Sequence, residues 1–242
     1  MQGPARHALA LTLAAALCSA ANAQMMHPGY GTVGAPMSNF ISSSYLTQQV
    51  VNDTSFKKSV TGKLALRPGG SIASRDLVTF APAAGGATVA EELARSYPQA
   101  SRAQAQHVFE ELLGGYRQLE QRFKIPPRDL AGATAAFIAG SYMGYHNVDF
   151  PDANFPPLVA QMRSILADVP GVRNASDAEK QEMYEKMAIL GMFMATTQMA
   201  LKKQPNPKVE ANMRQAAKGY LEQFLKADAQ RVQIGANGVV LR

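Results

Sequence analysis

A short loop between two expected helices holds the best local group of residues that could bind a metal ion. The stretch HNVDFPDAN, residues 146–154, supplies the candidate ligands His146, Asp149, Asp152 and Asn154. Carboxylate and amide oxygens at such spacings suit a hard cation such as Ca²⁺, and His146 could add an imidazole nitrogen. A structural interpretation competes, because Asp152 or Asn154 can cap the following helix while the prolines shape the turn. The spacing matches no standard metal-binding loop, so no metal site is assigned.

Other sequence patterns give weaker evidence for a catalytic or cofactor-binding site. A literal GxGxxG occurs at residues 29–34, but it lies in a Gly- and Ser-rich stretch and not between a strand and a helix, as dinucleotide binding requires. The acidic pairs Glu91-Glu92 and Glu110-Glu111 are neighbours in the chain, so on a helix their side chains diverge and cannot cooperate as acid and base. The sequence therefore assigns no catalytic residue and no cofactor site.

Methionine is frequent, with 12 residues in the chain and several of them in MAILGMFMATTQM, residues 187–199. Such a pattern could serve copper binding or protection against oxidants. Methionine at helical spacing is more typical of core filling, because its flexible side chain adapts to irregular gaps. We therefore interpret these methionines as core residues.

The first 23 residues have the pattern of a secretory signal peptide. Arg6 precedes an apolar run from Ala8 to Leu17, and the tripeptide Ala-Asn-Ala at 21–23 matches a cleavage signal. The run is too short to anchor the chain permanently in a bilayer, so we expect cleavage before Gln24 and a periplasmic or secreted protein. The single cysteine, Cys18, would leave with this leader, so no disulfide would stabilise the mature chain.

Three regions are expected after the leader. Residues 24–86 are rich in Gly, Ser, Pro and Thr and sustain no helical period, which predicts an irregular arm or linker with one or two short strands. Residues 87–229 should form an α-helical domain, a mainly α bundle of about five to six helices. Residues 230–242 should form either a frayed tail or a short β hairpin around Asn237-Gly238.

Capping signals and prolines set the expected helix bounds. Thr88, Ser101 and Ser176 are each followed three residues later by Glu or Gln, which is the pattern of a capping box. Breaks are expected where proline removes a backbone donor and disfavours helix in the residue before it. An apolar stripe at three- and four-residue spacing includes Val108, Leu112, Tyr116, Leu119 and Phe123. The expected helices cover residues 88–96, 101–123, 128–147, 155–168, 176–203 and 207–228.

One expected helix carries no Asp, Glu, Lys or Arg over residues 130–148. Its alanines, glycines and polar residues make it too weakly apolar for a membrane-spanning helix. Small residues recur every four positions and form a packing ridge at Gly132, Ala136, Gly140 and Gly144. Another helix can approach such a ridge closely, and the uncharged stretch 187–201, with Gly191 and Ala195, is the expected partner. These two helices should form the buried centre of the bundle.

Two helix starts carry a family resemblance. SDAEKQE at 176–182 opens one helix, and the uncharged helix is opened by Phe123, Ile125, Asp129, Leu130 and Ala133. With these motifs, residues from about 75 to 228 resemble a family of exported, uncharacterised proteins of Gram-negative bacteria, catalogued as a domain of unknown function. The sequence departs from that pattern in having no tryptophan. The resemblance implies an exported helical protein, and it carries over no catalytic residue.

The leading functional hypothesis is a non-enzymatic binding or assembly protein of the cell envelope, with residues 24–86 in contact with a protein partner. One alternative is an envelope enzyme that uses carboxylates and His146 in a groove between helices, which requires a pocket where a buried carboxylate has a raised pKa. Another is a small-ligand carrier with a cavity in the bundle. The net charge of +6 is spread along the chain, so no nucleic-acid partner is expected. The sequence does not set the oligomeric state.

Overall fold

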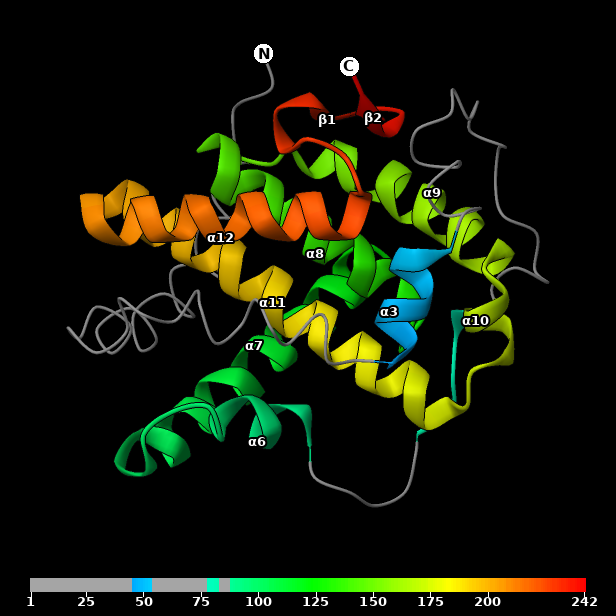
Figure 1. Cartoon of the computed structure of the whole chain (residues 1–242), viewed down its shortest axis with the longest axis horizontal. Coiled ribbons are helices and arrows are strands. Elements are labelled where there is room, and N and C mark those ends of the chain that lie inside the picture. The colour runs from blue at the N-terminus through cyan, green and yellow to red at the C-terminus, as the bar shows by residue number, and fades with distance from the viewer. Residues whose placement is uncertain (1–44, 54–77, 83–87) are drawn as a thin grey trace, which may run out of the picture.

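The computed structural model describes residues 45–53, 78–82 and 88–242. The leader at 1–23, its cleavage site, the GxGxxG segment and most of the expected arm lie outside the described residues. The described part is mainly α-helical, with a C-terminal β hairpin (Figure 1). In chain order its elements are α3 (Tyr45–Asn52), α6 (Val89–Ala94), η2 (Gln99–Ser101), α7 (Arg102–Arg122), α8 (Leu130–His146), η3 (Asp152–Asn154), α9 (Phe155–Asp168), α10 (Pro170–Asn174), α11 (Asp177–Lys203), α12 (Pro207–Leu225), η4 (Ala229–Arg231), β1 (Val232–Gly235) and β2 (Gly238–Leu241).

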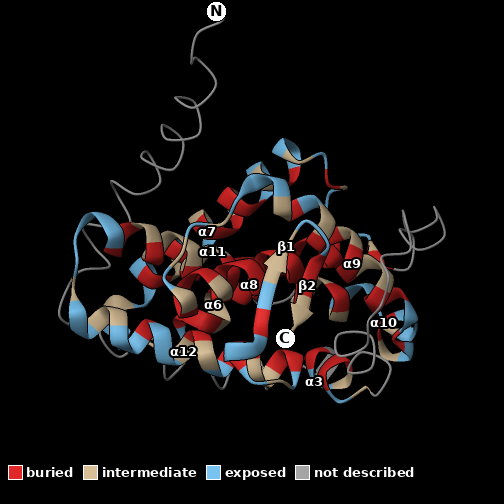
Figure 2. Ribbon diagram, turned by 90° about the horizontal axis from the view of Figure 1, so that it is seen from above, coloured by how far each residue is buried: buried red, intermediate tan, exposed pale blue. Residues whose placement is uncertain are grey.

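Helix α8 forms the centre of the bundle. Every residue of α8 except Tyr142 and His146 is buried, and α11, α9 and α12 all pack against it (Figure 2). This burial explains why the helix tolerates no charged side chain, since an unpaired charge in its position would lose its hydration. No helix in the described ranges is long and apolar enough to cross a membrane. The mainly α fold predicted from the sequence is confirmed.

The crossing of α8 and α11 is so close that their backbones touch. A Cβ atom on Gly140 would overlap the carbonyl oxygen of Gly191, and a Cβ on Gly191 would lie 2.6 Å from the carbonyl oxygen of Ala136. The other two ridge residues face different neighbours: Gly132 meets the side chains of Tyr116 and Ile125, and Gly144 meets α11 and α12. The ridge therefore packs against several elements and not only one partner helix.

The C-terminal hairpin has a two-residue turn at Ala236 and Asn237, with Gly238 at φ 80°. Its second strand is held on α9 by one side chain. The Gln161 amide nitrogen donates to the carbonyl oxygen of Val239 at 2.8 Å, and the Val239 amide donates back to Gln161 Oε1 at 2.7 Å. The Gln161 side chain thus makes the pair of hydrogen bonds to Val239 that the backbone of a neighbouring strand would make. The hairpin alternative of the sequence prediction is confirmed.

Two of the predicted helix caps are present. Thr88 accepts a hydrogen bond from the amide of Glu91, and Ser176 forms a complete capping box with Glu179. The box predicted at Ser101 is wrong, because this residue ends the 3-10 segment η2 and its side chain makes no capping hydrogen bond. Preceding Pro98 starts that tighter turn, so the chain enters α7 without the extended N-cap geometry that a box requires.

The interval 24–86 contains structure that the sequence did not predict. An irregular arm with one or two short strands was expected there, but residues 45–52 form helix α3, which packs against α10, α11 and α12. Val50 and Val78 are fully inaccessible, and Phe80 packs edge-on against Tyr184 with ring centroids 5.4 Å apart. The apolar residues are separated by Gly- and Ser-rich sequence, which hides their contribution to the core. The described parts of this interval therefore belong to the helical body.

Candidate functional site

The candidate metal ligands of the sequence analysis are not gathered at one point. Asp149 pairs with Lys202 of α11 at 2.7 Å, whereas Asp152 pairs with Arg122 of α7. Asn154 precedes α9 without making a side-chain capping bond, so the alternative interpretation as a helix cap does not hold for Asn154. Across residues 45–53, 78–82 and 88–242, no three His, Cys, Asp or Glu side chains could hold a metal ion together.

His146 packs against aromatic rings at the C-terminal end of α8. Its ring centroid lies 4.4 Å from that of Tyr142 and 4.8 Å from that of Tyr145. Burial lowers the pKa of His146, although hydrogen bonds with the backbone of Ala229 and Val232 act in the opposite direction. The imidazole of His146 is therefore held between two aromatic rings and away from the candidate ligands Asp149 and Asp152.

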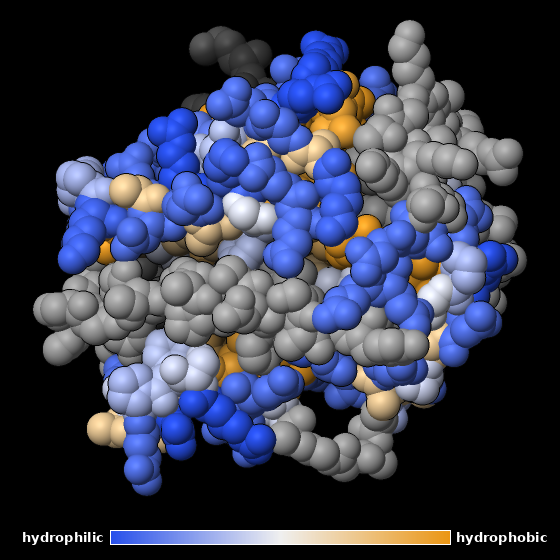
Figure 3. All heavy atoms as spheres, in the orientation of Figure 1, coloured by the Kyte–Doolittle hydropathy of each residue, from blue (hydrophilic) through white to orange (hydrophobic). Residues whose placement is uncertain are grey.

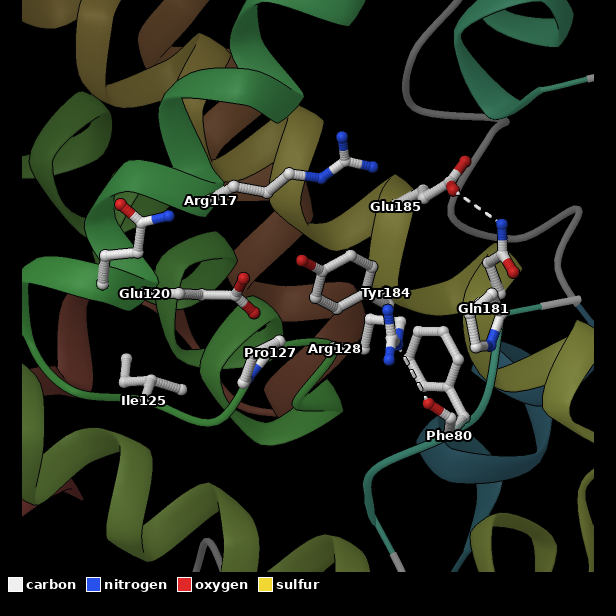
Figure 4. A pocket seen from close by; sticks show the side chains of 11 residues that line it. Phe80, Arg117, Glu120, Ile125, Pro127, Arg128, Gln181, Tyr184 and Glu185 are labelled. Atoms are coloured by element: carbon white, nitrogen blue, oxygen red, sulfur yellow. Dashed lines mark hydrogen bonds between the residues drawn. The ribbon is translucent and has the colours of Figure 1, made fainter.

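A pocket of about 290 Å³ opens on the other side of the bundle, where α7, α11, the α7–α8 loop and residues 78–82 meet (Figure 4). One part of its wall is apolar and consists of Phe80, Pro82, Ile125 and Pro127. The other part is polar and consists of Arg117, Glu120, Gln121, Arg128, Gln181, Tyr184 and Glu185. The pocket is therefore amphipathic, with groups of both charges around a hollow of small-molecule size.

Glu120 is the most unusual group in this pocket. Only 4% of the residue is exposed, and its Oε1 atom has no hydrogen-bond partner. The carboxyl group is hydrogen bonded by Tyr184 and by the backbone at Arg128 and Asp129. Burial disfavours the charged form more than these hydrogen bonds favour it, and it raises the pKa of Glu120 from 4.5 to about 7. Glu120 can therefore gain or lose a proton near neutral pH.

Tyr184 connects Glu120 to the rim of the pocket. Its hydroxyl group points toward Glu120 in Figure 4, and both Glu120 and Arg117 act on it as hydrogen-bonding neighbours. Burial and the neighbouring carboxyl group raise the pKa of Tyr184, so the phenol stays protonated at neutral pH. Edge contacts with Phe80 and Tyr116 fix the ring, with centroids 5.4 and 5.6 Å away. The Tyr184 ring is thus held in place beside Glu120.

The loop between α7 and α8 forms the floor of the pocket. Lys124 and Arg128 both have left-handed backbone angles, with φ of 54° and 58°. Each such residue other than glycine costs on the order of 1 kcal/mol, and such strain tends to gather at functional sites. Arg128 Nε donates to the carbonyl oxygen of Phe80 at 3.2 Å, which joins this loop to residues 78–82.

A buried ion pair holds the end of the same loop. Asp129 has a fully buried side chain, and it pairs with Arg163 of α9, which is 12% exposed. Asp129 Oδ1 also accepts from the amide of Ala131 at 2.9 Å and so caps α8. An isolated backbone bridge joins Asp129 to Thr79. The loop is therefore attached to the central helix, to α9 and to residues 78–82.

His146 and the pocket carboxylate lie far apart. The pocket adjoins the start of α8, whereas His146 ends this helix, and the rise of 1.5 Å per residue separates the two ends by about 24 Å. The two groups cannot act on one substrate. The enzyme alternative of the sequence analysis therefore loses His146 but retains a buried carboxylate with a raised pKa.

Sequence reasoning missed Glu120, although a signal was present. The buried face of α7 includes Phe109, Leu113 and Tyr116, and the next step of this three- and four-residue spacing falls on Glu120. A carboxylate at a core position of an amphipathic helix indicates either a paired charge or a ligand site. The predicted stripe instead continued to Leu119 and Phe123, which are only partly buried.

The fold and the pocket define a mainly α-helical protein with a small amphipathic site beside its central helix. The chain belongs to DUF6683, a family of unknown function, whose model matches residues 3–242. No curated protein and no solved structure matches the chain. The resemblance to a family of unknown function is therefore confirmed, while export from a Gram-negative cell stays a prediction.

Proposed function

We propose that the protein binds a small molecule in the pocket between α7 and α11, with Glu120 as its central polar contact. The observation that supports this proposal is the buried carboxyl group of Glu120, a residue of the pocket lining whose Oε1 atom has no hydrogen-bond partner. A buried polar atom left in this state costs about 1–3 kcal/mol. A ligand that hydrogen bonds Oε1 would recover this free energy on binding.

The size and lining of the pocket agree with such a role. Its volume of about 290 Å³ is at the lower end of the range for small-molecule sites. Ligand sites commonly combine apolar walls with a few fixed polar groups, as Phe80 and Ile125 do here with Tyr184 and Glu120. A small amphipathic ligand fits this arrangement better than a protein segment does.

Location and partner are part of the same proposal. The signal-peptide pattern at residues 1–23 supports export, and we propose that the ligand is bound in the periplasm or outside the cell. A protein partner that contacts the interval 24–86 is an alternative to a small-molecule ligand, although Val50, Val78 and Phe80, in the described part of this interval, are buried in the helical body. These side chains are not accessible to a second protein.

Acid–base catalysis is the second candidate. The pKa of Glu120, raised to about 7, lies near neutral pH, where a carboxyl group transfers protons most effectively in either direction. Tyr184 would hold the carboxyl group in place and keep its own proton. Chemical change of a bound molecule would distinguish catalysis from binding.

A thermal-shift screen of small amphipathic molecules tests the proposed site. We expect compounds that raise the melting temperature of the full chain and lose this effect in Gln121→Trp, whose indole would fill the pocket from its exposed rim. The matched control is Gln118→Trp, an exposed position on the same helix that does not line the pocket. Mass spectrometry of each active compound after incubation separates binding from turnover. Compounds that stabilise all three proteins equally, or no active compound at all, would overturn the proposal.

A further inference from the structure

We infer that the ligand of this pocket is a small monocarboxylic acid with an apolar body, whose carboxylate group lies against Arg117 and the Glu120 carboxyl group. This inference rests on the proposed function, since it names the chemical class that the same site accepts. It follows from the charge of the lining, the direction of its donors and the position of its apolar wall.

The charge of the lining favours one negative charge. Arg117 and Arg128 are permanently cationic, and Glu185 supplies one negative charge. Glu185 accepts a hydrogen bond from Gln181 at 3.0 Å, and Figure 4 shows this pair at the far side of the pocket from Glu120. With Glu120 protonated, the lining carries one net positive charge. With Glu120 ionised, this excess disappears and a second carboxylate faces the hollow.

The donors converge on one part of the pocket. A protonated Glu120 carries an O–H group, which a carboxyl group in the pocket lining can donate to a ligand. An incoming carboxylate offers an acceptor, and hydrogen bonds of the O–H···O⁻ type are short and strong. Arg117, beside Tyr184, can supply a second donor from the rim. A cationic ligand would meet these donors and Arg117 unfavourably.

The apolar wall provides for the body of the ligand. Phe80, Pro82, Ile125 and Pro127 line the pocket without a polar side-chain atom. A body about the size of one ring would remove this surface from water and stabilise the complex by the hydrophobic effect. A pocket of about 290 Å³ leaves room for such a body and one carboxylate. An inorganic anion would leave the apolar wall exposed to water.

Binding of the anion should take up a proton on Glu120. The titratable and charged groups around Glu120 come from α7, α11, the loop and α9, and they are Arg117, Tyr116, Tyr184, Glu185, Arg128, Asp129 and Arg163. Asp129 disfavours the ionised form of Glu120, although Arg163 partly balances its charge. A bound carboxylate adds to this repulsion. Affinity should therefore decrease as Glu120 loses its proton above neutral pH.

Calorimetric titration of the full chain with three probes of one shape tests the inference. Benzoate, benzamide and benzamidinium differ in charge and have nearly the same size. We expect benzoate to bind most tightly at pH 6 and to bind about tenfold more weakly at pH 8, the loss that proton linkage gives. Glu120→Gln should bind benzoate equally at both pH values, because its amide does not titrate. Glu110→Gln, an exposed position on α7, should keep the tenfold difference.

The outcomes separate this inference from the proposed function. Tighter binding of benzamidinium or benzamide, or benzoate binding that is equal or tighter at pH 8, would overturn the monocarboxylate inference and leave the pocket as a ligand site. The monocarboxylate inference would also be overturned if none of the three probes bound while compounds from the thermal-shift screen still lost their effect in Gln121→Trp. The pocket would then remain a ligand site. Benzoate binding that persists in Gln121→Trp would place it elsewhere and contradict the proposed site as well.

Discussion

Glu120 shows how one residue can convert a packing position into a chemical site. It occupies a core position of α7, but its neighbours leave one carboxyl oxygen without a partner. Tyr184 and the backbone at Arg128 and Asp129 fix the orientation of the group without fully stabilising its charge. The raised pKa follows from this partial compensation. It links the stability of the fold to pH.

The free energy of unfolding should depend on the charge of Glu120. Its pKa rises from 4.5 to about 7 on folding, so the folded state holds the proton more strongly than the unfolded state. This contribution to stability is complete below pH 4.5 and is lost as the pH rises through 7, to a total of at most about 3 kcal/mol. Urea unfolding of the wild type and Glu120→Gln at pH 5 and pH 8 measures it.

We expect Glu120→Gln to gain stability relative to the wild type between pH 5 and pH 8, because glutamine stays neutral. Glu110→Gln serves as the control, and its difference from the wild type should be the same at both pH values. A Glu120→Gln difference that does not change with pH would show that Glu120 is already ionised in the folded protein.

At the scale of elements, the contact between α8 and α11 determines how the bundle closes. Gly140 and Gly191 bring the two backbones together, so any side chain at either position must displace a whole helix. Overlap with backbone cannot be relieved by rotation of a side chain. The small-residue ridge is therefore a requirement of packing at this point.

Gly140→Ala should destabilise the protein by about 3 kcal/mol or more, because its Cβ would overlap the carbonyl oxygen of Gly191. Gly114→Ala in α7 is the matched control, since a Cβ atom there would meet no atom within 4 Å. Alanine is the better helix former by about 1 kcal/mol, so the control should be slightly stabilised. Melting temperatures of both variants test the difference. Equal melting temperatures would contradict the close crossing.

The helical elements could be predicted from local signals. The predicted bounds of the helix at 155–168 match α9, and the Ser176 box predicted the start of α11 to within a residue. Helix α10 and helix α3 were missed because each is short, and short helices depend on tertiary contacts more than on their own propensity. The packing of Gln49 of α3 on Gly171 of α10 is such a contact. The spacing of apolar residues in the sequence does not predict it.

At the scale of the whole molecule, N-terminal segments complete a body built mainly from later helices. Residues 45–53 and 78–82 contribute buried side chains, while hydrophilic residues dominate the described surface on the face shown in Figure 3. The pocket itself combines positions 80–82, 117–128 and 181–185. Such a site could not be predicted from the sequence, because only tertiary packing brings its walls together.

A shortened chain tests the role of these segments. A chain that begins at Thr88 loses α3 and residues 78–82, and with them the fully buried Val50 and Val78 and one wall of the pocket. A chain that begins at Ser44 keeps every described residue. We expect the Thr88 chain to melt at a clearly lower temperature than the Ser44 chain, since each buried valine contributes about 1.5 kcal/mol or more. Equal melting temperatures would show that the helices at 88–242 form a complete body alone.

Crystallographic screening of the full chain with small fragments tests the central claim most directly. We predict that fragments gather in the pocket beside α7, with a polar atom within hydrogen-bond distance of the Glu120 carboxyl group and an apolar part against Ile125 and Pro127. Fragments that bind only at other places, while this pocket stays accessible in the crystal, would contradict the assignment of a ligand site at Glu120.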